Sequence, residues 1–206
     1  MLGVYNYTVV LTYIGMLTGF VGVTYAMNGN VHAALVCLMI AGVCDMFDGA
    51  IASTMQRTDQ EKRFGVQIDS LSDLVCFGVL PAVIAYTAAG QTMASLYLAG
   101  LYLLCALIRL AWFNVDEEER QEHEGGSRKV YLGLPVTTAA LLLPAMMELG
   151  APLGWPVGSL APLMLLVMAA AFLTPFKLRK PQLPGKAVML LAGATEFVVL
   201  MTRAVV

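Results

Sequence analysis

Charged residues are scarce in this chain. Asp, Glu, Lys and Arg make up 13% of its 206 residues, about half of the roughly 25% that a soluble domain carries. Hydrophobic residues account for 59%, more than one small core could bury. The composition excludes a soluble globular enzyme. It favours a single integral membrane domain over 1–206, because no linker rich in Ser, Pro or charge divides the chain.

Three further features are missing. A basic excess is absent, since the net charge is −2, and a protein that binds nucleic acid needs a basic face to neutralise phosphates. The N-terminal segment MLGVYNYTVV lacks the positive charge that opens a secretory signal peptide, so we expect its apolar stretch to remain in the mature protein. Paired cysteines of a zinc site or disulfide framework are lacking too. The four cysteines stand singly in apolar stretches, which favours helix packing: Cys37, Cys44, Cys76 and Cys105.

The chain consists largely of long hydrophobic runs. A helix needs about 20 mostly apolar residues to span a bilayer, and seven stretches meet or nearly meet that length. The sequence therefore predicts an all-α polytopic membrane protein. We expect between six and eight spanning helices, because Gly and Pro around 150–156 blur two boundaries. The stretches run over about 5–27, 32–55, 65–89, 92–115, 131–149, 156–175 and 186–205.

The basic residues predict an orientation. Ten of the twelve Lys and Arg residues fall in the connections after the second, fourth and sixth stretches, or at their ends, whereas the connections 28–31, 89–91 and 150–155 contain none. Because cytoplasmic loops hold the excess of Lys and Arg, we expect the three basic loops and the N-terminus to face the cytoplasm. The segment 116–129, which begins the middle one, is predicted to be a solvated charged loop.

Four Asp residues stand where charge is expensive. An ionisable side chain in a spanning helix costs about 2.5–3.5 kcal/mol on insertion scales and indicates function. Asp45 and Asp48 lie in the second stretch, and Asp69 and Asp73 lie in the third. Residues three or four positions apart share a helix face, and a short loop joins the two stretches. We expect all four carboxylates to gather near the cytoplasmic surface, the second pair one to two turns into its helix.

Gathered carboxylates repel one another unless a cation neutralises them. Oxygen ligands suit a hard divalent ion such as Mg²⁺, Mn²⁺ or Ca²⁺. Four Asp side chains are enough to hold two ions of the kind that assist phosphoryl displacement. Spacing alone leaves two other interpretations open: the Asp residues form a cation or proton pathway, or they are solvated separately.

Small residues accompany the Asp pairs. Gly49 and Ala52 lie one turn beyond the first pair, and Gly65 begins the third stretch. A helix surface without bulky side chains lets a flat group such as a nucleotide approach the backbone, although close helix packing explains small residues equally well. Close packing is the interpretation that we give to three glycines of the first stretch: Gly15, Gly19 and Gly22.

These residues together resemble the signature of the CDP-alcohol phosphatidyltransferases. Its seven fixed positions run here as Asp45-x-x-Asp48-Gly49-x-x-Ala52 and then Gly65-x-x-x-Asp69-x-x-x-Asp73. Three stretches are similar to the phosphatidylserine synthase branch of that family: 64–82, 106–115 and 133–140. The resemblance implies a six-helix core with one or two extra transmembrane helices, and it puts the signature on the second and third helices, about 32–55 and 65–89.

The resemblance also implies a reaction. Family members transfer the phosphatidyl group of a CDP-linked lipid to an alcohol and release CMP, with two divalent ions held by four Asp residues. Carried over by position, Asp45, Asp48 and Asp69 would be metal ligands, and Asp73 would be both a metal ligand and the catalytic base. The same carry-over assigns the binding of the CDP-lipid to Asp48, Gly49, Ala52, Gly65 and position 53, which is Ser53 here, and we add Arg57 of the following connection as a candidate.

Two departures from the family pattern concern the nucleotide. The family has Arg where this chain has Ser53, and the eleven residues 54–64 make a longer gap before Gly65 than the pattern has. The missing Arg would normally help to hold the nucleotide or its phosphates. Either Arg57 or Lys62 of the longer connection replaces it, or the activity is altered.

Serine, as the acceptor, would need a cation for its carboxylate. Arg109 is the basic residue inside the spanning core, about two turns from the cytoplasmic end of the fourth helix. A buried Arg needs an anionic partner, so we expect it to hold the serine carboxylate or a substrate phosphate, unless it pairs with an Asp. Asn114 is a second candidate for contact with serine.

The sequence thus predicts a membrane-bound transferase of phospholipid biosynthesis that makes phosphatidylserine from CDP-diacylglycerol and L-serine. Its cofactors would be two divalent cations, Mg²⁺ or Mn²⁺, and the resemblance suggests a homodimer. Other acceptors, such as glycerol phosphate or inositol phosphate, fit the same chemistry, as does an ether-linked lipid. A cation- or proton-coupled transporter is the alternative from another class, which the clustering of all four Asp residues near one face disfavours.

Overall fold

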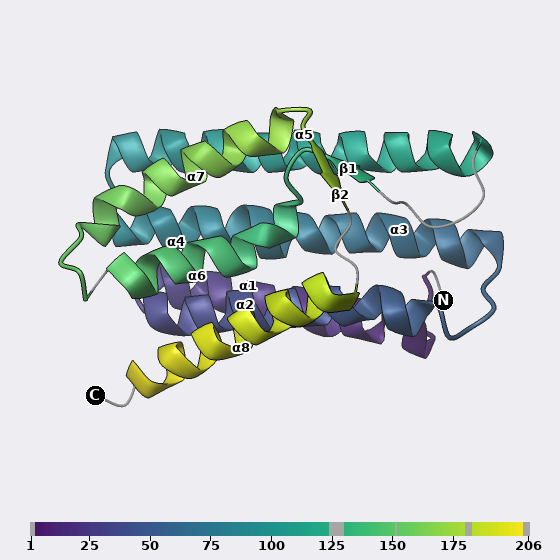
Figure 1. Cartoon of the computed structure of the whole chain (residues 1–206), viewed down its shortest axis with the longest axis horizontal. Coiled ribbons are helices and arrows are strands. Elements are labelled where there is room, and N and C mark those ends of the chain that lie inside the picture. The colour runs from purple at the N-terminus through teal and green to yellow at the C-terminus, as the bar shows by residue number, and fades with distance from the viewer. Residues whose placement is uncertain (1–2, 124–129, 151, 180–182, 204–206) are drawn as a thin grey trace.

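Long helices dominate the computed structural model, which describes residues 3–123, 130–150, 152–179 and 183–203 (Figure 1). A 3-10 turn at Tyr7–Val9 leads into α1 (Val10–Met27), and α2 (Val31–Ala52) packs against α1. A π-helical turn at Leu74–Val79 joins α3 (Asp59–Asp73) to α4 (Leu80–Ala88). The remaining helices are α5 (Met93–His123), α6 (Ala139–Gly150) after a 3-10 turn at Val136–Thr138, α7 (Val157–Leu173) and α8 (Leu183–Arg203).

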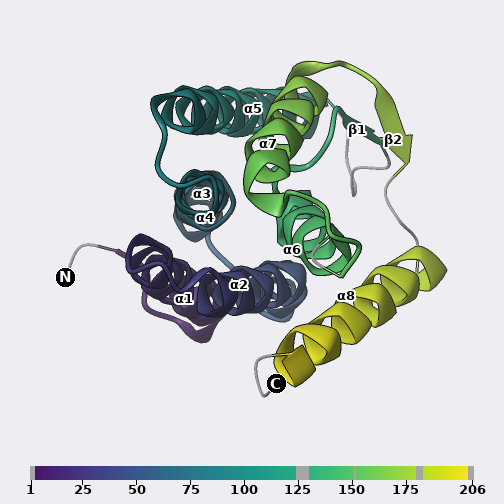
Figure 2. The same ribbon diagram turned by 90° about the vertical axis from the view of Figure 1, so that its left-hand side faces the viewer.

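The helices run roughly along the long axis of the molecule and form one bundle (Figure 1). The end-on view of Figure 2 shows α3 and α4 between the pair of α1 and α2 and the longer α5. Helix α8 lies at the periphery, where it contacts α6 and α2 (Figure 2). The central position of α3 and α4 brings three neighbouring helices, α1, α2 and α5, against the segment that carries two of the four Asp residues.

Four helical segments of the described residues are long and apolar enough to cross a bilayer, and three shorter apolar helices accompany them. Each of the seven corresponds to one of the seven stretches expected from the sequence, so the all-α polytopic membrane fold is confirmed. The long segments are Tyr7–Met27, Val31–Ala52, Asp59–Ala88 and Met93–Arg120, and the shorter ones are Val136–Gly150, Val157–Leu173 and Val188–Thr202.

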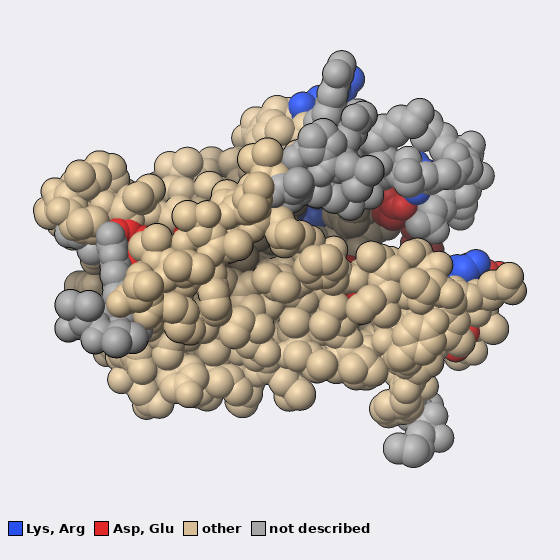
Figure 3. Space-filling model, turned by 60° about the horizontal axis from the view of Figure 1, so that its bottom comes forward, with Lys and Arg blue, Asp and Glu red and all other residues tan. Residues whose placement is uncertain are grey.

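The surface of the bundle is mostly uncharged. Large apolar side chains of α1, α5 and α7 are exposed on it, among them Phe20, Tyr97 and Val167. On the face in Figure 3, coloured Lys and Arg side chains gather toward the end of the molecule that carries the α2–α3 connection. An apolar surface with charge at its end is typical of a helix bundle whose solvent is lipid.

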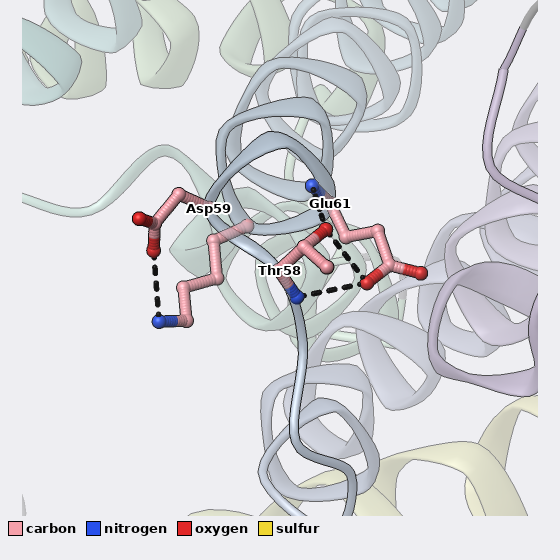
Figure 4. A network of polar contacts seen from close by, with 4 residues as sticks. Thr58, Asp59 and Glu61 are labelled. Atoms are coloured by element: carbon pink, nitrogen blue, oxygen red, sulfur yellow. Dashed lines mark hydrogen bonds and ion pairs between the residues drawn. The ribbon is translucent and has the colours of Figure 1, made fainter.

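The start of α3 corrects a sequence-based boundary. The third stretch was expected from about residue 65, but α3 begins at Asp59 because Thr58 and Glu61 form a capping box (Figure 4). The Glu61 amide donates to Oγ1 of Thr58 at 3.3 Å, and the Thr58 amide donates to Oε2 of Glu61 at 2.9 Å. Asp69 and Asp73 therefore lie about three and four turns into the helix, not one to two.

The charged segment after the fourth stretch is a second correction. We expected a loop over 116–129, but residues 116–123 continue α5, and residues 124–129 lie outside the described part of the chain. Glu117 and Arg120 form an ion pair at 2.6 Å one turn apart, and Glu, Arg and Gln are good helix formers. Local propensity thus extends the helix beyond its apolar part.

A short strand pair joins the segment before α6 to the segment after α7. Strand β1 (Val130–Leu132) lies where the fifth apolar stretch was expected to begin, and it pairs antiparallel with β2 (Lys177–Arg179). Gly133 follows β1 with φ of +75°, and a Cβ there would lie 2.9 Å from the carbonyl oxygen of Phe172. The close approach needs glycine, and it fixes the entry to α6 against the end of α7.

The glycines of α1 pack as expected. Gly15, Gly19 and Gly22 are buried, and a Cβ on Gly19 would lie 2.6 Å from the sulfur of Cys76. A Cβ on Gly22 would lie 2.8 Å from the Cβ of Cys37. The absence of side chains lets α1 approach both α2 and the π-helical turn. Helix α1 is thereby held close to the four Asp residues.

Candidate active site

One pocket lies where α1, α2, α3 and the π-helical turn meet. Its empty space, including the open solvent at its mouth, is about 190 Å³. The four signature Asp residues all line it, so the structure brings together the two pairs that the sequence separates by 20 residues and more. The lining also includes polar and small residues of α1 and α2: it is formed by Thr12, Gly15, Ala41, Cys44, Asp45, Asp48, Asp69, Ser72, Asp73, Cys76 and Phe77.

Three of the four carboxylates lie especially close together. One oxygen from each of Asp45, Asp48 and Asp69 lies within 4.8 Å of the others. Asp73 lines the same pocket one turn deeper on α3 but is not part of this closest group. The i, i+3 spacing on α2 and the i, i+4 spacing on α3 turn each pair toward the other helix.

Helix α1 supplies contacts that the sequence reasoning missed. The hydroxyl of Thr12 donates to Oδ2 of Asp48 at 3.2 Å, and the hydroxyl of Ser72 donates to the Thr12 carbonyl at 3.4 Å. The thiol of Cys76 donates to the Gly15 carbonyl at 3.3 Å. These hydrogen bonds orient a carboxylate and join α1 to the helix that carries Asp69 and Asp73. The one signal in the sequence for this contact was the position of Thr12, a polar residue on the same face of α1 as the packing glycines.

The donor set fits a hard divalent cation. Every group of the close trio is a carboxylate oxygen, the ligand type that Mg²⁺, Mn²⁺ and Ca²⁺ prefer. No Lys or Arg is among the described residues that line the pocket. Ionised acidic groups held this close in a partly buried pocket repel one another, and a bound metal ion would offset their charge. The Asp cluster can therefore bind a metal.

The small residues of the signature are not among those that line the pocket, but Gly49 directly follows Asp48 on α2 and Gly65 lies four positions before Asp69 on α3. Gly49 is exposed on α2, and nothing lies within 4 Å of the position that a Cβ would take there. Ser53 follows Ala52 at the end of α2, and its hydroxyl donates to the Ala50 carbonyl at 2.7 Å. Gly65 differs from Gly49, because a Cβ there would lie 3.2 Å from Nη1 of Arg57.

The two residues expected to bind serine both belong to α5. Arg109 is 6% exposed, its Nε donates to the Leu134 carbonyl at 3.3 Å, and its guanidinium lies 5.6 Å from the centre of the Phe113 ring. Asn114 accepts a hydrogen bond at 2.9 Å from the hydroxyl of Ser70, the neighbour of Asp69. Neither residue is among those that line the pocket of the four Asp residues.

The chain belongs to the CDP-alcohol phosphatidyltransferase family, whose model matches residues 5–176. The matched part contains α1 to α7 and all four Asp residues, and α8 follows it. Six apolar helical segments of the described residues thus lie in the matched region, because α3 and α4 form one segment, and four of the six are long enough to cross a bilayer. The expected six-helix core with an extra helix is confirmed.

Several relatives are similar over about two thirds of the chain. An archaetidylserine synthase of Methanothermobacter thermautotrophicus is 33% identical over 65% of this chain and 54% of its own length. The CDP-diacylglycerol–serine O-phosphatidyltransferase of Saccharomyces cerevisiae is 36% identical over 64% of this chain and 51% of its own length. That of Bacillus subtilis is 27% identical over 67% of this chain and 73% of its own length. The chain thus spans about half the length of the first two relatives.

Proposed function

We propose that the protein transfers the phosphatidyl group of CDP-diacylglycerol to the hydroxyl of L-serine and releases CMP. The observation that carries the proposal is the convergence of the four signature carboxylates on one pocket, in a chain whose family and named relatives are transferases of this kind. The family and the relatives also speak against the transporter interpretation, which depended on spacing alone.

The reaction assigns distinct tasks to the Asp residues. The carboxylate of Asp73 takes the proton of the serine hydroxyl as that oxygen attacks the lipid-side phosphorus. A new bond forms between phosphorus and the serine oxygen, the bond from phosphorus to the bridging oxygen breaks, and CMP leaves with the electron pair. Asp73 then passes its proton to water. A positioned carboxylate acting as base contributes about 10²–10⁴-fold to such a rate.

The other carboxylates hold the charge of the reaction centre. Asp45, Asp48 and Asp69, together with Asp73, would bind two divalent cations, Mg²⁺ or Mn²⁺, which offset the negative charge of the pyrophosphate and of the leaving CMP. The Thr12 hydroxyl donates a hydrogen bond to Asp48. Residues around a metal ligand commonly orient the ligand in this way. Its hydrogen bond limits the orientations that this carboxylate can take.

The substrates would enter from two sides. Gly49, Ala52, Ser53 and Gly65 border the route of the nucleotide, and the open space over Gly49 supports close approach of a flat base to α2. Arg109 and Asn114 are proposed to bind serine. Both belong to α5, which packs against the π-helical turn and α3, and Asn114 already contacts the residue next to Asp69 through Ser70.

The arrangement of the chain in the membrane belongs to the same proposal. The pocket would face the cytoplasm, since Asp45 and Asp48 lie near the end of α2 that leads into the connection with Arg57, and cytoplasmic loops hold such basic charge. A homodimer is the proposed assembly, and it rests on the family resemblance.

An assay of CMP release tests the function. Purified protein is incubated with CDP-diacylglycerol, Mn²⁺ or Mg²⁺, and either serine, glycerol phosphate or inositol phosphate. We expect release with serine only, no release with a chelator, and a rate lower by about 10²–10⁴-fold in Asp73→Asn. Because the relative at 33% identity is named for an archaeal lipid, an ether-linked CDP-lipid is tested in parallel.

A matched control is Asp59→Asn, an exposed position on the same helix with a side chain that is 92% exposed. It should leave the rate unchanged. Release that persists without divalent ions, or no release with any of the acceptors, would contradict the proposal.

A further inference from the structure

We propose that Arg57, in the connection between α2 and α3, binds the pyrophosphate of the CDP-lipid and takes over the role of the Arg that the signature has at position 53. The inference rests on the proposed function, because it names a contact to that substrate. Its starting point is one observation: the guanidinium of Arg57 lies against Gly65, another residue of the signature, although the two are eight positions apart.

The location of the guanidinium follows from the spacing along α3. Nη1 of Arg57 lies 3.2 Å from the position that a Cβ on Gly65 would take. Gly65, Asp69 and Asp73 are spaced by four residues and share one face of α3. Four residues of an α-helix rise about 6 Å, slightly more than one turn. Because the guanidinium lies against Gly65, it lies about one turn from Asp69, toward the start of the helix. A phosphate group held at the Asp residues would lie within reach of the long Arg side chain.

The connection that carries Arg57 is held at both ends by the N-terminal segment. The hydroxyls of Tyr7 and Thr54 lie 3.1 Å apart in a hydrogen bond, and Nδ2 of Asn6 donates to Oε1 of Glu61 at 3.0 Å. The capping box of Thr58 and Glu61 (Figure 4) fixes the turn into α3. Arg57 stands between these anchors. A contact from a restrained segment loses less conformational freedom when the ligand binds.

The other candidates for the role are engaged elsewhere or carry no charge. Ser53 is exposed and directs its hydroxyl to the Ala50 carbonyl of its own helix. The ammonium of Lys62 forms an ion pair at 3.2 Å with Asp59, and both side chains are mostly exposed. Arg57 is partly buried. Position and burial thus favour Arg57 over Lys62.

The chemistry of the substrate explains why a cation is needed there. The pyrophosphate is an anion that must approach four carboxylates, and no Lys or Arg is among the described residues that line their pocket. An Arg at the edge of the pocket attracts the pyrophosphate and can donate two parallel hydrogen bonds to its oxygens. Gly65 leaves the space in which the planar guanidinium lies.

The test moves the Arg side chain from position 57 to position 53, where the family signature has it. Three variants are compared with the wild type: Arg57→Ser, the double variant Ser53→Arg with Arg57→Ser, and Arg63→Ser as the matched loss of an exposed Arg on α3. For each, the apparent KM for CDP-diacylglycerol, the KM for serine and the dissociation constant of CDP with Mg²⁺ are measured. Thermal unfolding in detergent monitors the fold.

We expect Arg57→Ser to raise the KM for CDP-diacylglycerol and the dissociation constant of CDP by about tenfold or more, the usual size of a lost charge-assisted hydrogen bond. The KM for serine and the unfolding temperature should stay the same. The double variant should recover most of the loss, and Arg63→Ser should resemble the wild type.

Unchanged CDP binding in Arg57→Ser would overturn the inference, and so would a loss that tracks a lower unfolding temperature and is not recovered in the double variant. These outcomes leave the proposed function intact, because the wild type still binds CDP and releases CMP. A wild type that does neither would instead count against the proposed function itself.

Discussion

Gly49 is a glycine that helix packing does not explain, so close approach of a ligand to α2 is the reason that we give for it. Glycine inside a helix is about 0.8–1.0 kcal/mol less favourable than alanine, yet Gly49 lies within α2, next to Asp48. Nothing lies within 4 Å of a Cβ built there, so helix packing does not require the glycine. The packing glycines of α1 differ, because each would bring a Cβ within 3.1 Å of a neighbour.

Replacing Gly49 with alanine should therefore stabilise the fold and damage the enzyme. We expect Gly49→Ala to raise the free energy of unfolding by up to about 1 kcal/mol and to raise the KM for CDP-diacylglycerol by about tenfold. Thermal unfolding in detergent and CMP release measure the two effects. Gly100→Ala on α5 is the matched control, since a Cβ there also meets nothing within 4 Å, and it should stabilise without a loss of activity. An active Gly49→Ala enzyme would exclude close approach at this position.

At the scale of elements, the irregular turn between α3 and α4 directly follows Asp73 and is stabilised by a neighbouring helix. Pro81 lacks an N–H and removes a hydrogen bond from the turn before it, where the chain forms the π-helical turn at Leu74–Val79. The hydroxyl of Tyr102 donates to the carbonyl of Phe77 at 2.6 Å. Helix α5 thus supplies a hydrogen bond to the irregular part of its neighbour, next to the active site.

Loss of that hydroxyl should destabilise the protein. Tyr102 is fully buried, so Tyr102→Phe leaves the Phe77 carbonyl without this donor at a cost of about 1–3 kcal/mol. We expect a lower unfolding temperature in detergent. Tyr97→Phe on the same helix, where the side chain is 71% exposed, should change nothing. Equal stability of the two variants would show that the carbonyl needs no donor from α5.

The same elements show what the sequence could and could not predict. Apolar length and helical spacing predicted the seven segments and the meeting of four Asp residues, because both depend on local periodicity. The Thr-x-x-Glu pattern at Thr58 would have predicted the earlier start of α3, although apolar length alone misses it. Thr12 and the neighbourhood of Arg57 and Gly65 depend on contacts between distant segments, which one sequence does not encode locally.

For the molecule as a whole, the charge distribution predicts one orientation in the membrane. Arg57, Lys62 and Arg63 lie in the α2–α3 connection and the first turns of α3, whereas the α6–α7 connection at the other end of the bundle contains no Lys or Arg (Figure 1). Lys62, near the start of α3, and Leu153, in the α6–α7 connection, have exposed side chains and lie at these two ends of the bundle. The native cysteines are all buried, so a single introduced cysteine can report the side on which each end lies.

We expect Lys62→Cys to react with a membrane-impermeant maleimide only after the membrane is made permeable, and Leu153→Cys to react in intact cells. The positive-inside rule is the physical reason. The unmodified chain, with its four buried cysteines, is the control for background labelling. The reverse pattern would place the Asp pocket on the outer side of the membrane, away from nucleotide substrates.

The pairing of β1 with β2 also has a consequence for biogenesis. The two strands flank α6 and α7 in the sequence, so the ladder closes only after both helices have been synthesised. Chains emerge N-terminal first at about 5–20 residues per second, and α1 to α5, with all four Asp residues, precede this closure. The strand pair therefore joins the two ends of the α6–α7 segment at a stage when the four Asp residues have already been synthesised and α8 has not.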